Sequence, residues 1–300
     1  MRRSTFRTLI GLSALTASVM LTSCGSEKAE TTETTAPSVA QADSMPTAPS
    51  AADDFFARIP TASAVPALLE RSGAEYNKTL VNKAGKATAY STSAAKAAIN
   101  LGVYGADMAY LCAYEKNKEA QAYIKDIQKL AEHLNANDAF GAAMLERMKK
   151  NMENNDSLMA LTDEGIRLAN SLLKQSERKA DAFLIGAGGF IEGLYLATGL
   201  VEAFPKDMKP ADRDLVLMPL TRTIVDQKKP LTDLVEIGKD VPSSPEVDAL
   251  KTDLAALLDI YNKLNIDEQI KANKGEMILG DATLHAISEK VKTTRTSLIK

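Results

Sequence analysis

The segment from Phe183 to Gly199, FLIGAGGFIEGLYLATG, constrains the fold more than any other part of this chain. It holds five glycines and a single carboxylate, Glu192, and its other residues are mostly apolar. A segment of this composition is a glycine-rich phosphate loop, a membrane span, or a helix buried at the centre of a folded body. Each alternative makes a demand that the surrounding sequence can test.

The first two alternatives fail these tests. A dinucleotide-binding G-x-G-x-x-G motif starting at Gly186 needs a third glycine at position 191, which is Ile191, and no strand pattern precedes it. No Lys-Ser or Lys-Thr pair follows the glycines, so the P-loop motif is missing too. A membrane span is disfavoured because Glu192 interrupts the apolar run, and Lys179 and Asp181 crowd its start.

A central helix explains the glycines better. Four small residues recur at three- and four-residue spacing and share one helix face: Gly186, Gly189, Gly193 and Ala197. Each glycine costs about 1 kcal/mol of helix propensity, so a second helix should pack closely against this face. The earlier segment LGVYGADMAYLCA carries a matching stripe at Gly102, Gly105, Ala109 and Cys112. We predict that helices 94–114 and 177–203 cross here at the centre of a bundle.

Apolar residues recur three and four apart through most of the chain after Pro60, which predicts a series of helices. The expected ranges are 63–71, 94–114, 118–135, 138–152, 156–175, 177–203, 211–238, 244–264 and 282–299. Prolines 219 and 230 should kink or split helix 211–238, and 265–281 should be a loop with a short extended piece at 277–279. Because no two-residue alternation persists, we predict an all-α, antiparallel bundle of about seven to nine helices.

The N-terminus has the layout of a bacterial lipoprotein signal. Three arginines within the first seven residues precede an apolar run that is shorter than the roughly 20 residues a membrane span needs. The run ends in LTSC, which resembles the lipobox that directs acylation of its cysteine, here Cys24. We therefore expect a signal peptide over 1–23 and attachment to a lipid bilayer through acyl chains on Cys24.

Residues 24–60 are rich in Thr, Ala, Ser and Pro and are expected to form a disordered tether. Residues 61–300 should then form a single helical domain. Removal of 1–23 would leave 33 basic and 39 acidic residues, a net charge near −6, without a Lys/Arg cluster that could bind nucleic acid. Gly25, rather than aspartate, after the acylated cysteine indicates the outer membrane, and the side of that membrane stays open.

Two carboxylates on the central helices form the candidate site. Asn100, Tyr104 and Asp107 share a second face of helix 94–114, and Glu192 and Tyr195 are neighbours on helix 177–203. An ionised carboxylate in a core costs several kcal/mol unless it is paired. The favoured interpretation is that neighbouring groups satisfy both carboxylates. The alternative is a polar pocket that binds a cation or polar ligand, or that supplies a general acid and base.

Metal and covalent chemistry have little support. The two histidines, His133 and His285, belong to no H-E-x-x-H or repeated Glu-x-x-His arrangement, so no metal or cofactor is expected. No G-x-S-x-G or Cys/His constellation is present. Cys112, within MAYLCAY, is expected to be a small buried hydrophobe without a disulfide partner.

Two motifs carry a family resemblance. NLGVYGAD at 100–107 and GGFIEGLY at 188–195 resemble segments shared by a family of uncharacterised, helical lipoproteins of two-membrane bacteria. The likeness covers most of residues 65–300, although Phe190 stands where that family would carry tryptophan. The resemblance implies the helical fold and an envelope location, and it implies no activity.

Together these features predict a membrane-anchored lipoprotein of the cell envelope whose helical body binds a protein partner or a small ligand without catalysis. The alternative is an envelope hydrolase or lyase that uses Asp107 and Glu192, and a weaker third possibility is a purely structural or oligomerising module. The enzymatic alternative requires carboxyl groups less than about 10 Å apart that face a cavity.

Overall fold

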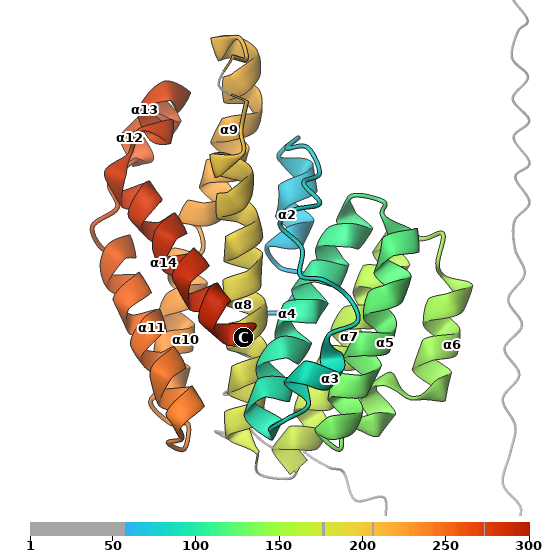
Figure 1. The fold of residues 1–300 in the computed structure, drawn as a ribbon. Helices are drawn as coiled ribbons and strands as arrows, with labels where there is room; N and C mark the ends of the chain where they lie inside the picture. Colours follow the sequence, from blue (N-terminus) through green and yellow to red (C-terminus); the bar gives the residue numbers. More distant parts are fainter. Residues whose placement is uncertain (1–57, 176–177, 206, 273) are drawn as a thin grey trace, which may run out of the picture. The chain divides into compact units, whose positions relative to one another are not determined.

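A computed structural model of the chain describes residues 58–175, 178–205, 207–272 and 274–300, which fall in one compact unit (Figure 1). Within these ranges the chain forms α-helices and one short 3-10 helix, and no strand. The all-α prediction is confirmed. Nine of the helices have nine residues or more, and additional short ones take the total above the predicted seven to nine. The expected signal peptide, Cys24 and nearly all of the expected tether lie outside the described residues.

Helices α4 (Ala94–Ala113) and α8 (Lys179–Glu202) form the centre, with the most extensive contact of any helix pair in the described ranges. The hydroxyl of Ser93 caps α4 by accepting the amide N–H of Lys96 at 3.1 Å. Among the described residues, α8 is the one helix long and apolar enough to cross a membrane, but 94% of its apolar window is buried inside the unit. In this structure α8 is therefore a core helix.

The helices from the first half of the chain cover one side of this pair. They are α2 (Pro66–Arg71), α3 (Ala87–Tyr90), α5 (Asn117–His133), the 3-10 helix η1 (Asn137–Phe140), α6 (Ala142–Lys150) and α7 (Asn155–Gln175). The single helix predicted over 138–152 is wrong. Gly141 has an extended backbone (φ −73°, ψ −177°) that separates η1 from α6.

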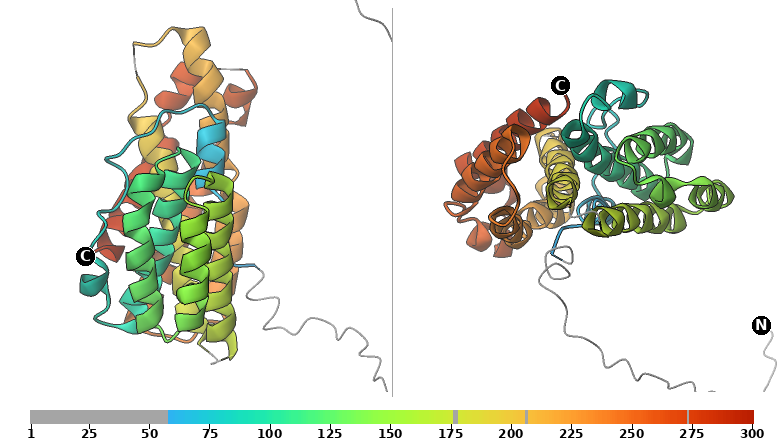
Figure 2. Two further views of the ribbon diagram at one scale, coloured as in Figure 1. Left: turned by 90° about the vertical axis from the view of Figure 1, so that its right-hand side faces the viewer. Right: turned by 90° about the horizontal axis from the view of Figure 1, so that it is seen from below.

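The helices from the second half lie on the other side of α8, as the end-on view in Figure 2 shows. They are α9 (Pro210–Val225), α10 (Lys228–Gly238), α11 (Pro245–Tyr261), α12 (Asp267–Lys271), α13 (Gly275–Leu279) and α14 (Ala282–Leu298). The predicted split of 211–238 occurs between α9 and α10 rather than at a proline. Pro219 stays inside α9, and Pro230 lies in the first turn of α10, where its missing N–H costs little.

The loop predicted over 265–281, with its extended piece at 277–279, is also wrong, because α12 and α13 form there. Ile266, which directly precedes α12, and Ile278 of α13 are buried, so apolar side chains hold this region against the core. Single helical turns lack the repeated spacing by which longer helices are recognised. The packed part of the chain also begins earlier than residue 61, because Ile59 is buried against Gly186.

Candidate functional site

The crossing of α4 and α8 brings backbone against backbone. A Cβ atom on Gly102 would lie 1.9 Å from the carbonyl oxygen of Ile185, and one on Gly188 would lie 2.3 Å from the carbonyl oxygen of Ile99. A Cβ on Gly189 would lie 3.2 Å from the carbonyl oxygen of Gly102. Side chains at these positions would push the helices apart, so the glycines set their separation.

The other glycines of the predicted stripes meet different partners. Gly186 lies against Ile59, Gly193 against Val65, and Gly105 against Ala62 and Ile166. Gly105, Gly186, Gly189 and Gly193 therefore make room largely for the segment 59–66 and for α7, in addition to the central crossing. Sequence analysis missed this segment as a partner and missed Gly188, which falls outside the three- and four-residue stripe.

The crossing also brings Asp107 of α4 close to Glu192 of α8. Both side chains have 0% relative exposure, and their carboxyl groups are within hydrogen-bonding reach of each other. Two carboxyl groups this close cannot both stay ionised without a compensating cation.

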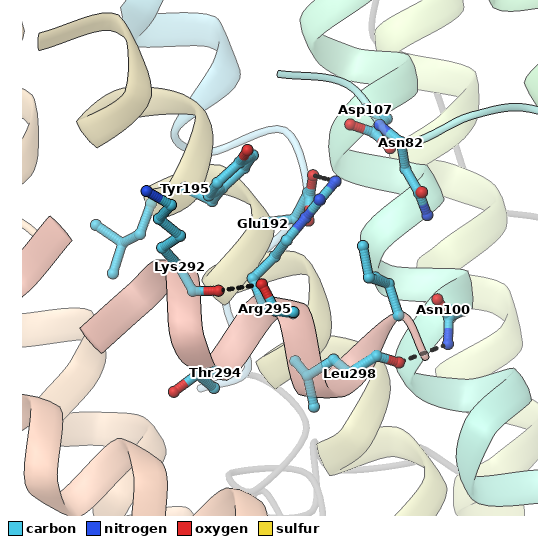
Figure 3. Close-up of polar contacts among 12 residues, drawn as sticks. Asn82, Asn100, Asp107, Glu192, Tyr195, Lys292, Thr294, Arg295 and Leu298 are labelled. Carbon is cyan, nitrogen blue, oxygen red and sulfur yellow. Dashed lines mark hydrogen bonds and ion pairs between the residues drawn. The ribbon is translucent and has the colours of Figure 1, made fainter. Parts of the chain in front are cut away.

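Arg295 of α14 lies beside Glu192, as Figure 3 shows, and its single positive charge neutralises one carboxylate and not two. Its Nε donates to Oε2 of Glu192 at 2.9 Å and its Nη2 donates to Oε1 at 3.0 Å, while its guanidinium carbon lies 4.4 Å from the ring centroid of Tyr195. Sequence analysis missed Arg295. A signal was present, because Ile287, Val291 and Arg295 follow one another at four-residue spacing and place this arginine on the buried stripe of its helix.

Burial raises the pKa values of both carboxyls, but the neighbouring groups that add to or oppose this rise differ between them. Burial raises the pKa of Asp107 well above its usual range, and the neighbouring Glu192 raises it further. Burial also raises the pKa of Glu192, but the charge and hydrogen bonds of Arg295 act against that rise. The negative charge therefore belongs on Glu192 and the proton on Asp107. This assignment makes the cluster of three side chains neutral.

Hydrogen bonds agree with this proton position. Oδ2 of Asp107 accepts the amide N–H of Asn82 at 3.1 Å, whereas Oδ1 has no donor within reach. A proton on Oδ1 removes the need for a donor and can be shared with Glu192.

The segment 77–87, which we call the strap, covers Asp107 and is held by side chains of α4 and α5. The contacts run from Asn77 N–H to the Tyr110 hydroxyl (2.9 Å), from the Tyr104 hydroxyl to Lys83 O (2.7 Å), from the Tyr123 hydroxyl to Asn82 O, and from Gly85 N–H and Ala87 N–H to Asp126 (2.6 and 3.3 Å). These bonds satisfy backbone groups that regular secondary structure would otherwise pair.

The residues predicted to share a polar pocket thus serve separate contacts. Tyr104 holds the strap, and Asn100 donates to the carbonyl oxygens of Lys96 (3.0 Å) and Leu298 (3.2 Å), which fastens the end of α14. Tyr195 stacks on Arg295. The structure brings Asp107, Glu192 and Tyr195 together, but none of the five predicted residues lines any of the four cavities described within these ranges.

The largest of these four cavities, about 520 Å³, lies at the C-terminal end of α8. Its apolar lining includes Val201, Phe204, Ile224, Leu279 and Leu284, and its polar lining includes Thr198, Glu202, His285, Ser288 and Glu289. The hydroxyl of Ser288 donates to Oε1 of Glu202. Sequence analysis missed this cavity, since its walls come from helices far apart in the chain.

Metal binding needs a cluster of ligating side chains, and thiol chemistry needs an accessible cysteine. No group of three or more His, Cys, Asp or Glu side chains there could hold a metal ion. The thiol of Cys112 is buried on α4, and burial raises its pKa to about 12, so it stays protonated at neutral pH.

Comparison of the chain with protein-family models, with curated proteins and with solved structures found no match. The resemblance to helical lipoproteins of two-membrane bacteria therefore stays a prediction, and a function can be inferred only from the geometry and chemistry of the site.

Proposed function

We propose that this protein is a lipid-anchored protein of the cell envelope, held at the outer membrane through Cys24, whose helical body binds a small ligand without catalysis. The cavity at the end of α8 carries the proposal. Its volume of about 520 Å³ lies within the roughly 300–1,000 Å³ of typical ligand pockets, and it combines apolar walls with a few polar groups.

The polar groups of this cavity do not support covalent catalysis. A serine, a histidine and a glutamate line it, but they do not form a triad. Ser288 donates directly to Glu202, and Nε2 of His285 lies 2.8 Å from the carbonyl oxygen of Leu279. A nucleophilic serine would instead bond to a histidine that can take its proton.

The buried carboxyl pair is equally unsuited to an enzyme. Asp107 and Glu192 are close enough to cooperate, yet both are fully buried, and Glu192 already binds Arg295 through both oxygens. A hydrolase or lyase needs space for its substrate beside the acid and base. The pair is better explained as the polar centre that joins α4, α8 and α14.

The binding proposal can be tested with N-phenyl-1-naphthylamine, an uncharged fluorescent probe of apolar cavities. Leu279→Trp would fill the cavity from its lining, and Met277→Trp is the matched control, because Met277 lies on the same short helix, is 55% exposed and is absent from the lining. We expect saturable fluorescence with the wild type and with Met277→Trp, and weak fluorescence with Leu279→Trp. Equal signals from all three proteins, or none from the wild type, would disprove binding in this cavity.

The anchoring proposal has a separate test. Wild-type protein should partition with membranes, and Cys24→Ala should release it into the soluble fraction. A Cys24→Ala protein that stays with membranes would show that the anchor lies elsewhere.

A further inference from the structure

The charge around the cavity at the end of α8 has one sign. The charged side chains in its lining are Glu202 and Glu289, and no lysine or arginine is among the described lining residues. Glu289 has a partner in Lys292 at 3.6 Å, but both side chains are more than half exposed, so this pair contributes little. The cavity therefore presents net negative charge to a ligand.

Glu202 is the better placed of the two carboxylates. It ends α8, and the buried hydroxyl of Ser288 on α14 holds its Oε1 in position. Its Oε2 receives no hydrogen bond from any described residue. A carboxylate that is fixed through one oxygen and open at the other is well suited to pair electrostatically with an organic cation.

The backbone adds charge of the same sign. The last turn of α8, with Thr198, Val201 and Glu202, faces the cavity, and the C-terminus of a long helix carries partial negative charge of about half an elementary charge. The first turn of α14 also reaches the cavity and would oppose this effect. However, Asp281 accepts the amide N–H groups of Thr283 and Leu284 at 2.9 and 2.8 Å, so a carboxylate already offsets that positive end.

We propose that this cavity binds an organic cation with an apolar body, such as an alkylammonium compound. The cationic head lies at Glu202, and the apolar body packs among Val201, Phe204, Ile224 and Leu284. The assignment rests on the proposed binding function and specifies its ligand class. A carboxylate or phosphate ligand would face two carboxylates and a helix C-terminus, and a neutral ligand would gain nothing from them.

The test compares three probes that share one chain length and differ in head charge: octyltrimethylammonium, octanol and octanoate. Isothermal titration at pH 7.5, below micelle-forming concentrations, should show the ammonium probe binding about two- to fivefold more tightly than octanol, the ratio expected for an ion pair with an exposed carboxylate such as Glu202. Octanoate should bind most weakly. Decyltrimethylammonium should gain roughly three- to fourfold per added methylene.

Glu202→Gln tests the residue, because it removes the charge and keeps an oxygen that can accept from Ser288. It should bring ammonium binding close to octanol binding and leave octanol binding unchanged. Glu236→Gln is the matched control, since Glu236 is an exposed carboxylate on α10 that pairs with Lys239 and lies outside the lining. It should behave as the wild type.

The outcomes separate the two proposals. If octanoate or octanol binds as tightly as the ammonium probe, or if Glu202→Gln keeps the preference, the ligand class is wrong and the binding function stands. If none of the octyl probes binds and N-phenyl-1-naphthylamine does not bind, the binding function fails with it.

Discussion

The ion pair between Glu192 and Arg295 provides a direct test of what holds the helical body together. Glu192 is fully buried, Arg295 is 12% exposed, and two hydrogen bonds of 2.9 and 3.0 Å join them. Arg295→Met keeps much of the aliphatic volume but leaves the carboxylate without its cation. Removing one partner of a buried pair costs about 3–5 kcal/mol, and loss of the stacking on Tyr195 adds about 0.5–2 kcal/mol. We expect the free energy of unfolding to fall by at least about 3 kcal/mol.

Urea unfolding followed by circular dichroism measures this loss. Lys292→Met is the matched control, because Lys292 lies three residues away on the same helix and is 55% exposed. It should change the free energy of unfolding by no more than about 0.5 kcal/mol. The double variant Glu192→Gln/Arg295→Met removes both charges, so it should recover much of what Arg295→Met alone loses.

Two results would refute this reasoning. A loss below about 1 kcal/mol for Arg295→Met would mean that Glu192 does not depend on a buried cation. A double variant no more stable than the single one would mean that the cost comes from lost packing of the arginine stem and not from an unpaired carboxylate.

Three further predictions follow from the same centre. Gly102→Ala should lower the free energy of unfolding by about 3 kcal/mol or more, since its Cβ would lie 1.9 Å from the carbonyl oxygen of Ile185. Gly238→Ala is the control, because its Cβ would have no neighbour closer than 3.5 Å, and it should shift the urea midpoint little. Equal losses for the two variants would contradict the close approach of the helices at Gly102. Because burial raises the pKa of Asp107, the native state keeps a proton that the unfolded chain releases above about pH 4. The free energy of unfolding of the wild type should therefore fall as pH rises from there toward the folded-state pKa. Asp107→Asn should flatten this dependence in urea titrations between pH 4 and 8, and parallel curves would place the proton elsewhere. Cys112 should react with iodoacetamide only in denaturant, and rapid labelling of the native protein in a mass spectrum would show that the thiol is accessible.

The long helices could be predicted from sequence because their signals are local. The spacing of apolar residues located α4 and α8. The helix starts carry local signals as well, since Ser93 and Ser244 cap α4 and α11 through their side chains in the structure. The shorter elements could not be found in this way. One turn of helix, as in α12 or α13, depends on packing by residues distant in sequence.

The candidate site could likewise be predicted only where its signals are local in the sequence. The composition of α4 and α8 was enough to single out Asp107 and Glu192 as carboxylates that needed an explanation. Their solution depends on Arg295, which lies 103 residues from Glu192 in the chain. A lone arginine on an amphipathic helix gives no indication of which carboxylate it meets. The cavity lay beyond sequence analysis for the same reason, since α8, α9, α13 and α14 enclose it together.

Helix α14 connects the two polar features of this protein. Its first two turns line the cavity through Leu284, His285 and Ser288, and its last two turns carry Arg295 to Glu192. Seven residues separate Ser288 from Arg295, about 10 Å of helix rise. The hydrogen bond between Ser288 and Glu202 and the ion pair between Arg295 and Glu192 therefore fasten one rigid helix to α8 at two points. Because the position of α14 sets one wall of the cavity, we expect the buried ion pair to support the proposed ligand binding by fixing the shape of the site, without touching the ligand.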